Sequence, residues 1–211
     1  MAVSFDVFGT LVAIERSGDP WAAVADSLAD RGVAVPEDWE AAYRSSHRDY
    51  ERGREAPIDE HVRLALASRD TEVTADTARE AVLDAFDGPV TRRDGAVAAL
   101  EAAHGRGPVA VCSNCSVPGL VERTLSRTGL GPARDCGPDA VVTSVGCGWR
   151  KPHAAIFEAT ADALDVPLAS LVHVGDDART DGGADRAGAR SVLLEDITLE
   201  TVAARLREGS L

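Results

Sequence analysis

The chain has 211 residues and a formal net charge of −13. This length suits one domain with a small addition, and it is enough to bury a hydrophobic core. The acidic balance and the lack of any Lys/Arg cluster exclude a nucleic-acid-binding surface and are typical of the surfaces of halophilic proteins. Apolar runs are only as long as strands, and no basic and apolar leader opens the chain, so we expect a cytoplasmic protein without membrane spans.

The chain opens with a β-rich run that ends at a glycine. Apolar residues alternate with smaller or polar ones over residues 3–7, which predicts a strand that enters a tight turn at Gly9. Asp6 therefore lies near the carboxyl end of this strand. In open α/β sheets, ligands bind outside the carboxyl ends of the strands. Asp6 is thus a candidate nucleophile or metal ligand.

The next segment has helical patterns and no strand-like run. Asp19-Pro20 is a typical helix start, with an N-cap followed by proline at the first helical position. Four helices are expected, at about residues 20–30, 36–51, 57–68 and 74–87. Residues 15–88 are therefore predicted to form a small all-helical domain, inserted into a core made of residues 1–14 and 89–211.

From residue 91 onward, helical and strand-like segments alternate. Helices are expected at residues 92–104, 117–128, 152–164, 181–189 and 197–208, and strands at 108–113, 139–144, 170–175 and 190–194. Regular alternation predicts a parallel sheet with helices on both faces. The predicted fold class is α/β, a doubly wound parallel sheet with a helical insertion after the first strand.

Polar residues follow the later strands as Asp6 follows the first. Ser113 and Asn114 end one strand, and their donors suit a phosphoryl group or a carboxylate. Asp176 and Asp181 follow another, and clustered carboxylates suit a hard cation such as Mg²⁺. Lys151, after a third strand and a glycine-rich loop, is the only lysine of the chain. Since lysine and arginine are not interchangeable in a tight site, we interpret Lys151 as a site residue.

An aspartate, a hydroxyl with an amide, a lysine and paired carboxylates, in this order, resemble the four motifs of the haloacid dehalogenase superfamily. The resemblance spans roughly residues 2–194 apart from the insertion, and it implies that the insertion is a cap that helps to select the substrate. It assigns catalysis to Asp6, Ser113 and Lys151, substrate binding to Thr10, Ser113, Asn114 and Lys151, and Mg²⁺ binding to Asp6, the carbonyl of Phe8, Asp176 and Asp181.

Position 8 departs from the phosphatases of this superfamily. They usually carry a second aspartate two residues after the nucleophile, as general acid and base, and this chain has Phe8 there. An aromatic residue at this position resembles the 2-haloacid dehalogenases, in which the aspartate attacks carbon without a metal. Those enzymes grip their substrate with a cap arginine, for which the candidates are Arg16, Arg31 and Arg44.

The acidic pair Asp176 and Asp181 has a metal rationale, and we give it more weight than Phe8. The sequence therefore predicts a Mg²⁺-dependent phosphatase that acts on a small phosphorylated metabolite through an aspartyl-phosphate. A metal-independent dehalogenase-like hydrolase and a weakly active protein that binds a phosphorylated ligand are the alternatives. The substrate is open, and so is the choice between monomer and homodimer.

The four cysteines do not form a metal-binding pattern. Cys112 and Cys115 have the spacing of a metal or redox pair, but Cys136 and Cys147 do not complete a second pair. We interpret them as structural thiols, with zinc binding and a redox pair as alternatives. His173, within a predicted strand, is expected to be a core histidine.

Overall fold

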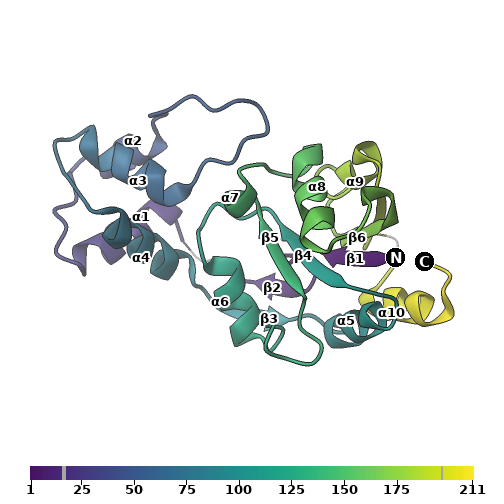
Figure 1. Cartoon of the computed structure of the whole chain (residues 1–211). Coiled ribbons are helices and arrows are strands. Elements are labelled where there is room, and N and C mark those ends of the chain that lie inside the picture. The colour runs from purple at the N-terminus through teal and green to yellow at the C-terminus, as the bar shows by residue number, and fades with distance from the viewer. Residues whose placement is uncertain (16–17, 196) are drawn as a thin grey trace.

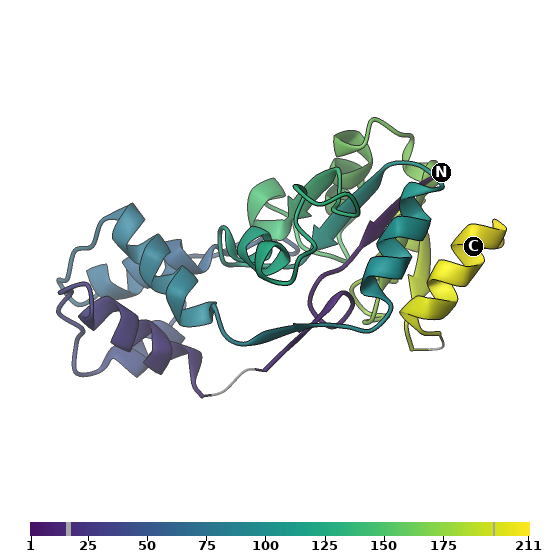
Figure 2. The same cartoon turned by 90° about the horizontal axis from the view of Figure 1, so that it is seen from below.

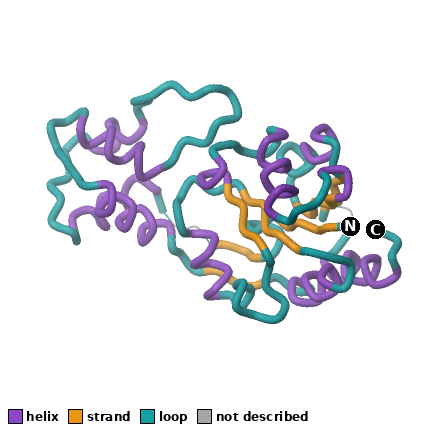
Figure 3. The backbone as a smooth tube through the Cα atoms, in the orientation of Figure 1, coloured by secondary structure: helices purple, strands orange, loops and turns teal. Residues whose placement is uncertain are grey.

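The computed structural model describes residues 1–15, 18–195 and 197–211. At its centre is a five-stranded parallel sheet in the order β5-β4-β1-β6-β7 (Figures 1 and 3). Its strands are β1 (Ala2–Phe5), β4 (Val109–Ser113), β5 (Ala140–Thr143), β6 (Leu171–Gly175) and β7 (Arg190–Leu193). The first strand of the chain is thus the middle strand of the sheet, with β4 and β6 as its neighbours.

Helices cover both faces of this sheet. The hydrophobic core on one face joins α5 (Ala96–His104), α6 (Leu120–Arg127) and α10 (Leu199–Glu208). The opposite face is covered by α8 (Ala154–Ala163) and α9 (Gly183–Ala187), which pack against each other (Figures 1 and 2). Because both faces are covered, β1, β4 and β6 are buried along their whole length. The predicted doubly wound α/β fold is confirmed.

The helical insertion forms a lobe of its own beside the core (Figure 2). It contains α1 (Pro20–Ala29), α2 (Trp39–Arg44), α3 (Ile58–Ala67) and α4 (Ala75–Phe86). The chain enters it through β2 (Val12–Ile14) and returns through β3 (Val90–Arg92), and these two strands pair antiparallel. The strand pair was not predicted, because three-residue strands give too short an apolar run to detect.

Four further elements differ from the prediction. The second helix ends at Arg44 rather than near residue 51, because the following Ser45 is extended and the chain crosses to the core instead. Residue 92 belongs to β3, and α5 starts only after Gly95, which has a φ of 77°. Two short helices, α7 (Ser144–Cys147) and η1 (Leu168–Ser170), were not predicted.

The remaining compositional expectations concern membranes and thiols. Within the described part of the chain, no helix has the length and apolar character needed to cross a bilayer. None of the four cysteines, all of which lie in the described part of the chain, forms a disulfide, and Cys112 and Cys115 are buried. Burial raises the pKa of Cys112 to about 11, so its thiol is protonated and unreactive at neutral pH.

Candidate active site

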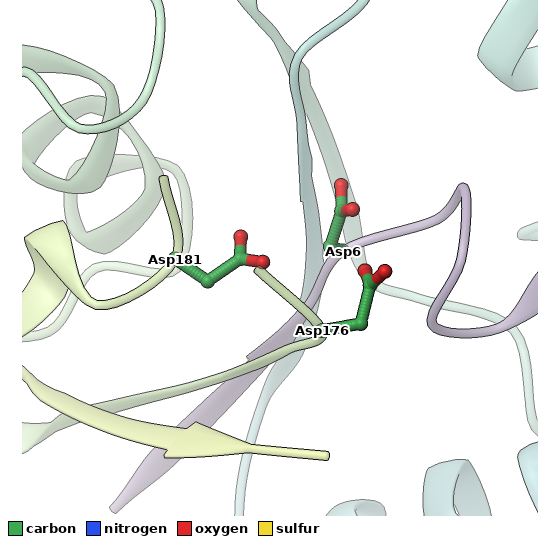
Figure 4. A group of neighbouring side chains, drawn as sticks. All are labelled: Asp6, Asp176 and Asp181. Carbon is green, nitrogen blue, oxygen red and sulfur yellow. The ribbon is translucent and has the colours of Figure 1, made fainter. Parts of the chain in front are cut away.

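Three carboxylates meet at the carboxyl ends of β1 and β6. Asp6 follows β1, and Asp176 and Asp181 follow the neighbouring strand β6. Each offers an oxygen, and these oxygens lie within 4.8 Å of one another. Figure 4 shows the three side chains pointing toward a common space. The strand order brings together residues that are up to 175 positions apart in sequence (from 6 to 181).

The only lysine of the chain is buried between two of these carboxylates. Lys151 Nζ lies 2.9 Å from Asp6 Oδ1 and 2.6 Å from Asp181 Oδ1. It also donates a 2.9 Å hydrogen bond to the carbonyl of Cys112. Burial alone would lower the pKa of Lys151, but the charges of Asp6 and Asp181 raise it well above its usual value. Lys151 is therefore a fixed positive charge beside Asp6.

The residues that end β4 have two different environments. The Asn114 side chain forms two hydrogen bonds with the backbone of Lys151. Its Oδ1 accepts from Lys151 N at 2.7 Å, and its Nδ2 donates to Lys151 O at 3.0 Å. Asn114 thus holds the backbone of Lys151, and its contact with the substrate stays a prediction. Ser113 Oγ is buried and has no hydrogen-bond partner within the described residues, so this hydroxyl is free to donate to a ligand.

The turn after β1 is tied to the acidic cluster. Thr10 Oγ1 donates a 2.9 Å hydrogen bond to Asp176 Oδ1. Gly9 has a φ of 92°, and a Cβ there would lie 2.2 Å from Asp176 Oδ2, so only glycine fits. Burial and the charges of Asp6 and Asp181 raise the pKa of Asp176, against the hydrogen bond from Thr10. Negative charge on Asp176 is thus unfavourable in this environment, and a nearby cation would stabilise it.

His173 is buried, as we expected of a core histidine, and it also contacts the site, which we did not predict. It is fully buried, and its Nε2 lies 3.0 Å from Asp181 Oδ1 while its Nδ1 lies 2.9 Å from Ser4 Oγ. Burial and the charge of Lys151 lower the pKa of His173, so we assign the neutral ring, with Nε2–H donating to Asp181. Ser4 and His173 are register partners in β1 and β6. The contact between Ser4 and His173 therefore depends on the strand order, which the sequence does not reveal.

Both carboxylate oxygens of Asp181 accept hydrogen bonds. Its Oδ1 accepts from Lys151 and His173, and its Oδ2 accepts from the backbone N–H of Asp177 at 3.0 Å. Burial would raise the pKa of Asp181, but His173 and Lys151 hold it well below its usual range. Asp181 is therefore ionised, and its direction is fixed before any ligand arrives.

The donor set fits a divalent cation. By formal charge, three carboxylates (−3) and one lysine (+1) leave the cluster of Asp6, Asp176, Asp181 and Lys151 at −2 when His173 is neutral. Carboxylate oxygens are the ligands that Mg²⁺ prefers, and a charge of +2 would balance the cluster. Asp176 has no cationic partner within the described residues, so it is the carboxylate with most to gain from a metal.

Two of the three candidate cap arginines pair with residues of the insertion itself. Arg16 lies outside the described residues. Arg31 is bound within the insertion, where it donates to the carbonyl of Ser27 and pairs with Asp84. Arg44 pairs with another residue of its own helix, Glu40, on the exposed surface.

Comparison with known proteins identifies relatives of this chain. The sequence model of the haloacid dehalogenase-like hydrolases matches residues 1–188. No curated protein matches the sequence. Among solved structures, the 2-haloacid dehalogenase from Pseudomonas syringae pv. Tomato DC3000 is 22% identical with a TM-score of 0.67, and the match covers 97% of this chain and 98% of that one.

Solved structures of two further proteins have a similar fold. CbbY from Rhodobacter sphaeroides, solved in complex with phosphate, is 22% identical with a TM-score of 0.59 and coverage of 91% and 84%. A HAD phosphatase from Thermococcus onnurineus is 21% identical with a TM-score of 0.53 and coverage of 91% and 85%. At such identities the likeness concerns the fold alone.

Proposed function

The chain belongs to the haloacid dehalogenase-like hydrolases, and from this premise we propose that it is a Mg²⁺-dependent phosphatase of a small phosphorylated metabolite. Structures of this fold include both phosphatases and dehalogenases, so membership does not choose between the two reactions. The observation that supports the phosphatase is the position of the Asp176 carboxylate in the acidic cluster. A metal-independent hydrolase has no use for this third carboxylate, which has no cationic partner within the described residues, beside Asp6 and Asp181.

Mg²⁺ would be held by Asp6, Asp176, Asp181 and the carbonyl of Phe8, and it would supply positive charge beside the phosphoryl oxygens. Asp6 attacks phosphorus, so that a carboxylate O–P bond forms while the bond to the leaving oxygen breaks. As the attack begins, Lys151 exchanges its contact with Asp6 for a phosphoryl oxygen, and the Ser113 hydroxyl donates to another, so both act in the transition state. Water finally cleaves the aspartyl-phosphate and releases phosphate.

Phe8 limits the substrates that suit this site. Its side chain can neither protonate a leaving group nor activate water, and losing a general acid–base group typically costs about 10²–10⁴-fold in rate. The loss is smallest when the leaving group departs as a stable anion. We therefore expect a preference for acyl or aryl phosphates over alkyl phosphates.

Replacing Phe8 with aspartate should restore the missing proton transfer. We expect Phe8→Asp to raise the hydrolysis of an alkyl phosphate such as glycerol phosphate by about 10²-fold or more, and to leave p-nitrophenyl phosphate nearly unchanged. Phe8→Asn is the control, because it has the same shape as aspartate and no acid. An equal gain in both variants would show that the space at position 8, and not the proton, limits the rate.

Gly175 is the last residue of β6, and its lack of a side chain leaves the space that Asp181 fills. A Cβ on Gly175 would lie 2.1 Å from Asp181 Cγ, so Gly175→Ala must displace that carboxylate. A misplacement of about 1 Å in an active site can cost about 10²-fold in kcat/KM, which is the loss that we expect here. Gly105→Ala, at the exposed end of α5 with a φ of −64°, should keep full activity. A fully active Gly175→Ala variant would show that activity does not depend on the position of the Asp181 carboxylate.

A pair of assays tests the proposed reaction class. Phosphate release from p-nitrophenyl phosphate is measured with Mg²⁺ and with EDTA, beside halide release from 2-chloropropionate, in molar salt because of the acidic surface. We expect phosphate release that EDTA abolishes. Halide release that EDTA does not affect would instead support the metal-independent hydrolase that Phe8 favours. Folded protein that is silent in both assays would favour binding of a phosphorylated ligand.

A further inference from the structure

A carboxylate from the helical insertion is buried in the core close to the site. Glu55 lies in the loop between α2 and α3, and its side chain is only 1% exposed. Its Oε1 accepts hydrogen bonds of 2.9 Å from Ser116 Oγ, Arg150 Nη1 and Ala56 N, and its Oε2 accepts from Ser144 Oγ. The carboxylate is therefore satisfied almost entirely by residues of the core.

These partners lie in the two loops that hold the site residues. Ser116 follows the loop of Ser113 and Asn114, and Arg150 directly precedes Lys151. Ser144, at the start of α7, also accepts a 2.9 Å hydrogen bond from the backbone N–H of Cys115. One carboxylate thus joins the loop that ends β4 to the loop that leads to Lys151.

The backbone of the same segment is bound to the core as well. Glu55 N donates to Gly148 O at 3.0 Å, Arg150 N donates to Gly53 O at 2.9 Å, and Ile58 N donates to Ser116 O at 3.0 Å. The contact continues at the surface, where the Arg54 guanidinium lies 4.3 Å from the centre of the Trp149 ring. Residues 53–58 are therefore attached to the core by backbone and side chains alike.

We propose that residues 53–58 are a fixed attachment of the insertion to the core, and that Glu55 is a positioning residue for the loops of Ser113 and Lys151. Loss of the Glu55 carboxylate would take the shared acceptor from four donors, Ala56 N, Ser116 Oγ, Ser144 Oγ and Arg150 Nη1. Such a loss costs most for a donor in the interior, and Ser144 is fully buried. The insertion is thus attached to the core here as well as through β2 and β3, and substrate enters while residues 53–58 stay in place.

Amide hydrogen exchange of the full-length protein tests the attachment without any assumption about the reaction. In the unaltered protein we expect the amides of Glu55, Ile58 and Arg150 to be protected together with the sheet. Exchange of these three amides at the rate of open loops, while the sheet stays protected, would overturn the fixed attachment.

Glu55→Gln tests the positioning role, with the exposed Glu51→Gln of the same loop as its control. We expect at least about tenfold faster exchange at the amides of Cys115 and Lys151 in Glu55→Gln and no change in Glu51→Gln. This readout stands even if the protein is not a phosphatase. Unchanged exchange at both amides in folded Glu55→Gln would overturn the role.

The kinetic consequence rests on the proposed phosphatase. Because Lys151 and Ser113 would act in the transition state, Glu55→Gln should lower kcat for p-nitrophenyl phosphate by about 10–100-fold and change KM little. If Glu55→Gln does not fold, Ser116→Ala removes one donor and keeps the carboxylate, and it should show the same pattern more weakly. Faster exchange at Cys115 and Lys151 with kcat unchanged would show that Glu55 holds the loops without serving the reaction.

Discussion

Replacing Asp6 with asparagine is expected to abolish turnover and to leave the fold intact. The amide has the shape of the carboxylate, but it cannot form the covalent bond to phosphorus. Removing the nucleophile of a catalytic unit takes away nearly all of its rate, so we expect kcat to fall by more than about 10⁴-fold. Phosphate release and thermal unfolding, measured on the same preparation, check both halves of the expectation.

The matched control for this variant is Asp177→Asn. Asp177 is adjacent to Asp176, and its side chain pairs with the exposed Arg179, outside the cluster. We expect this variant to keep its activity within about threefold, as for most surface substitutions. Undiminished activity of Asp6→Asn, or an equal loss in both variants, would remove Asp6 as the nucleophile.

The largest effect on stability is expected from Lys151→Met. Lys151 is buried between Asp6 and Asp181, so removal of its charge leaves two carboxylates without their cation. Breaking a buried ion pair in this way typically costs about 3–5 kcal/mol of the free energy of unfolding. Urea unfolding in molar salt and without Mg²⁺ measures this cost directly. A variant as stable as the unaltered protein would contradict the buried ion pair.

Two companion variants separate the charge of Lys151 from its shape. Adding Asp181→Asn to Lys151→Met removes one of the stranded carboxylates, so the double variant should lose less stability than the sum of the single variants. Lys151→Arg keeps the charge, but a planar fork does not fit a space made for an ammonium group. We expect it to lose most of the activity. Full activity of Lys151→Arg would show that charge alone is required.

Much of the candidate site could be predicted because it follows from the fold. Asp6, Lys151, Asp176 and Asp181 each follow a predicted parallel strand, and the carboxyl ends of such strands meet at one edge of the sheet. The uniqueness of Lys151 among the cationic residues added a second, independent reason. Neither the strand order nor any side-chain conformation is needed to place these four residues at one edge of the sheet.

The rest depends on contacts between segments that are far apart in the sequence. His173 meets Ser4 only because β6 lies beside β1, and local patterns do not determine strand order. The role of Glu55 could not be predicted, because this residue lies between two predicted helices, in a segment that crosses to the core. The hydrogen bonds between Asn114 and Lys151 depend on side-chain conformation, so sequence patterns do not predict them.

The most direct test of the phosphatase is whether Asp6 carries phosphate during turnover. Full-length protein with Mg²⁺ in molar salt is mixed with acetyl phosphate that carries a radiolabelled phosphoryl group, and it is then quenched in acid. Since Phe8 supplies no general base for the water step, we expect the aspartyl-phosphate to accumulate. Label should appear on the peptide that contains Asp6, and be absent with EDTA or in Asp6→Asn. Release of phosphate by the unaltered protein, with this peptide unlabelled throughout, would contradict the proposed mechanism.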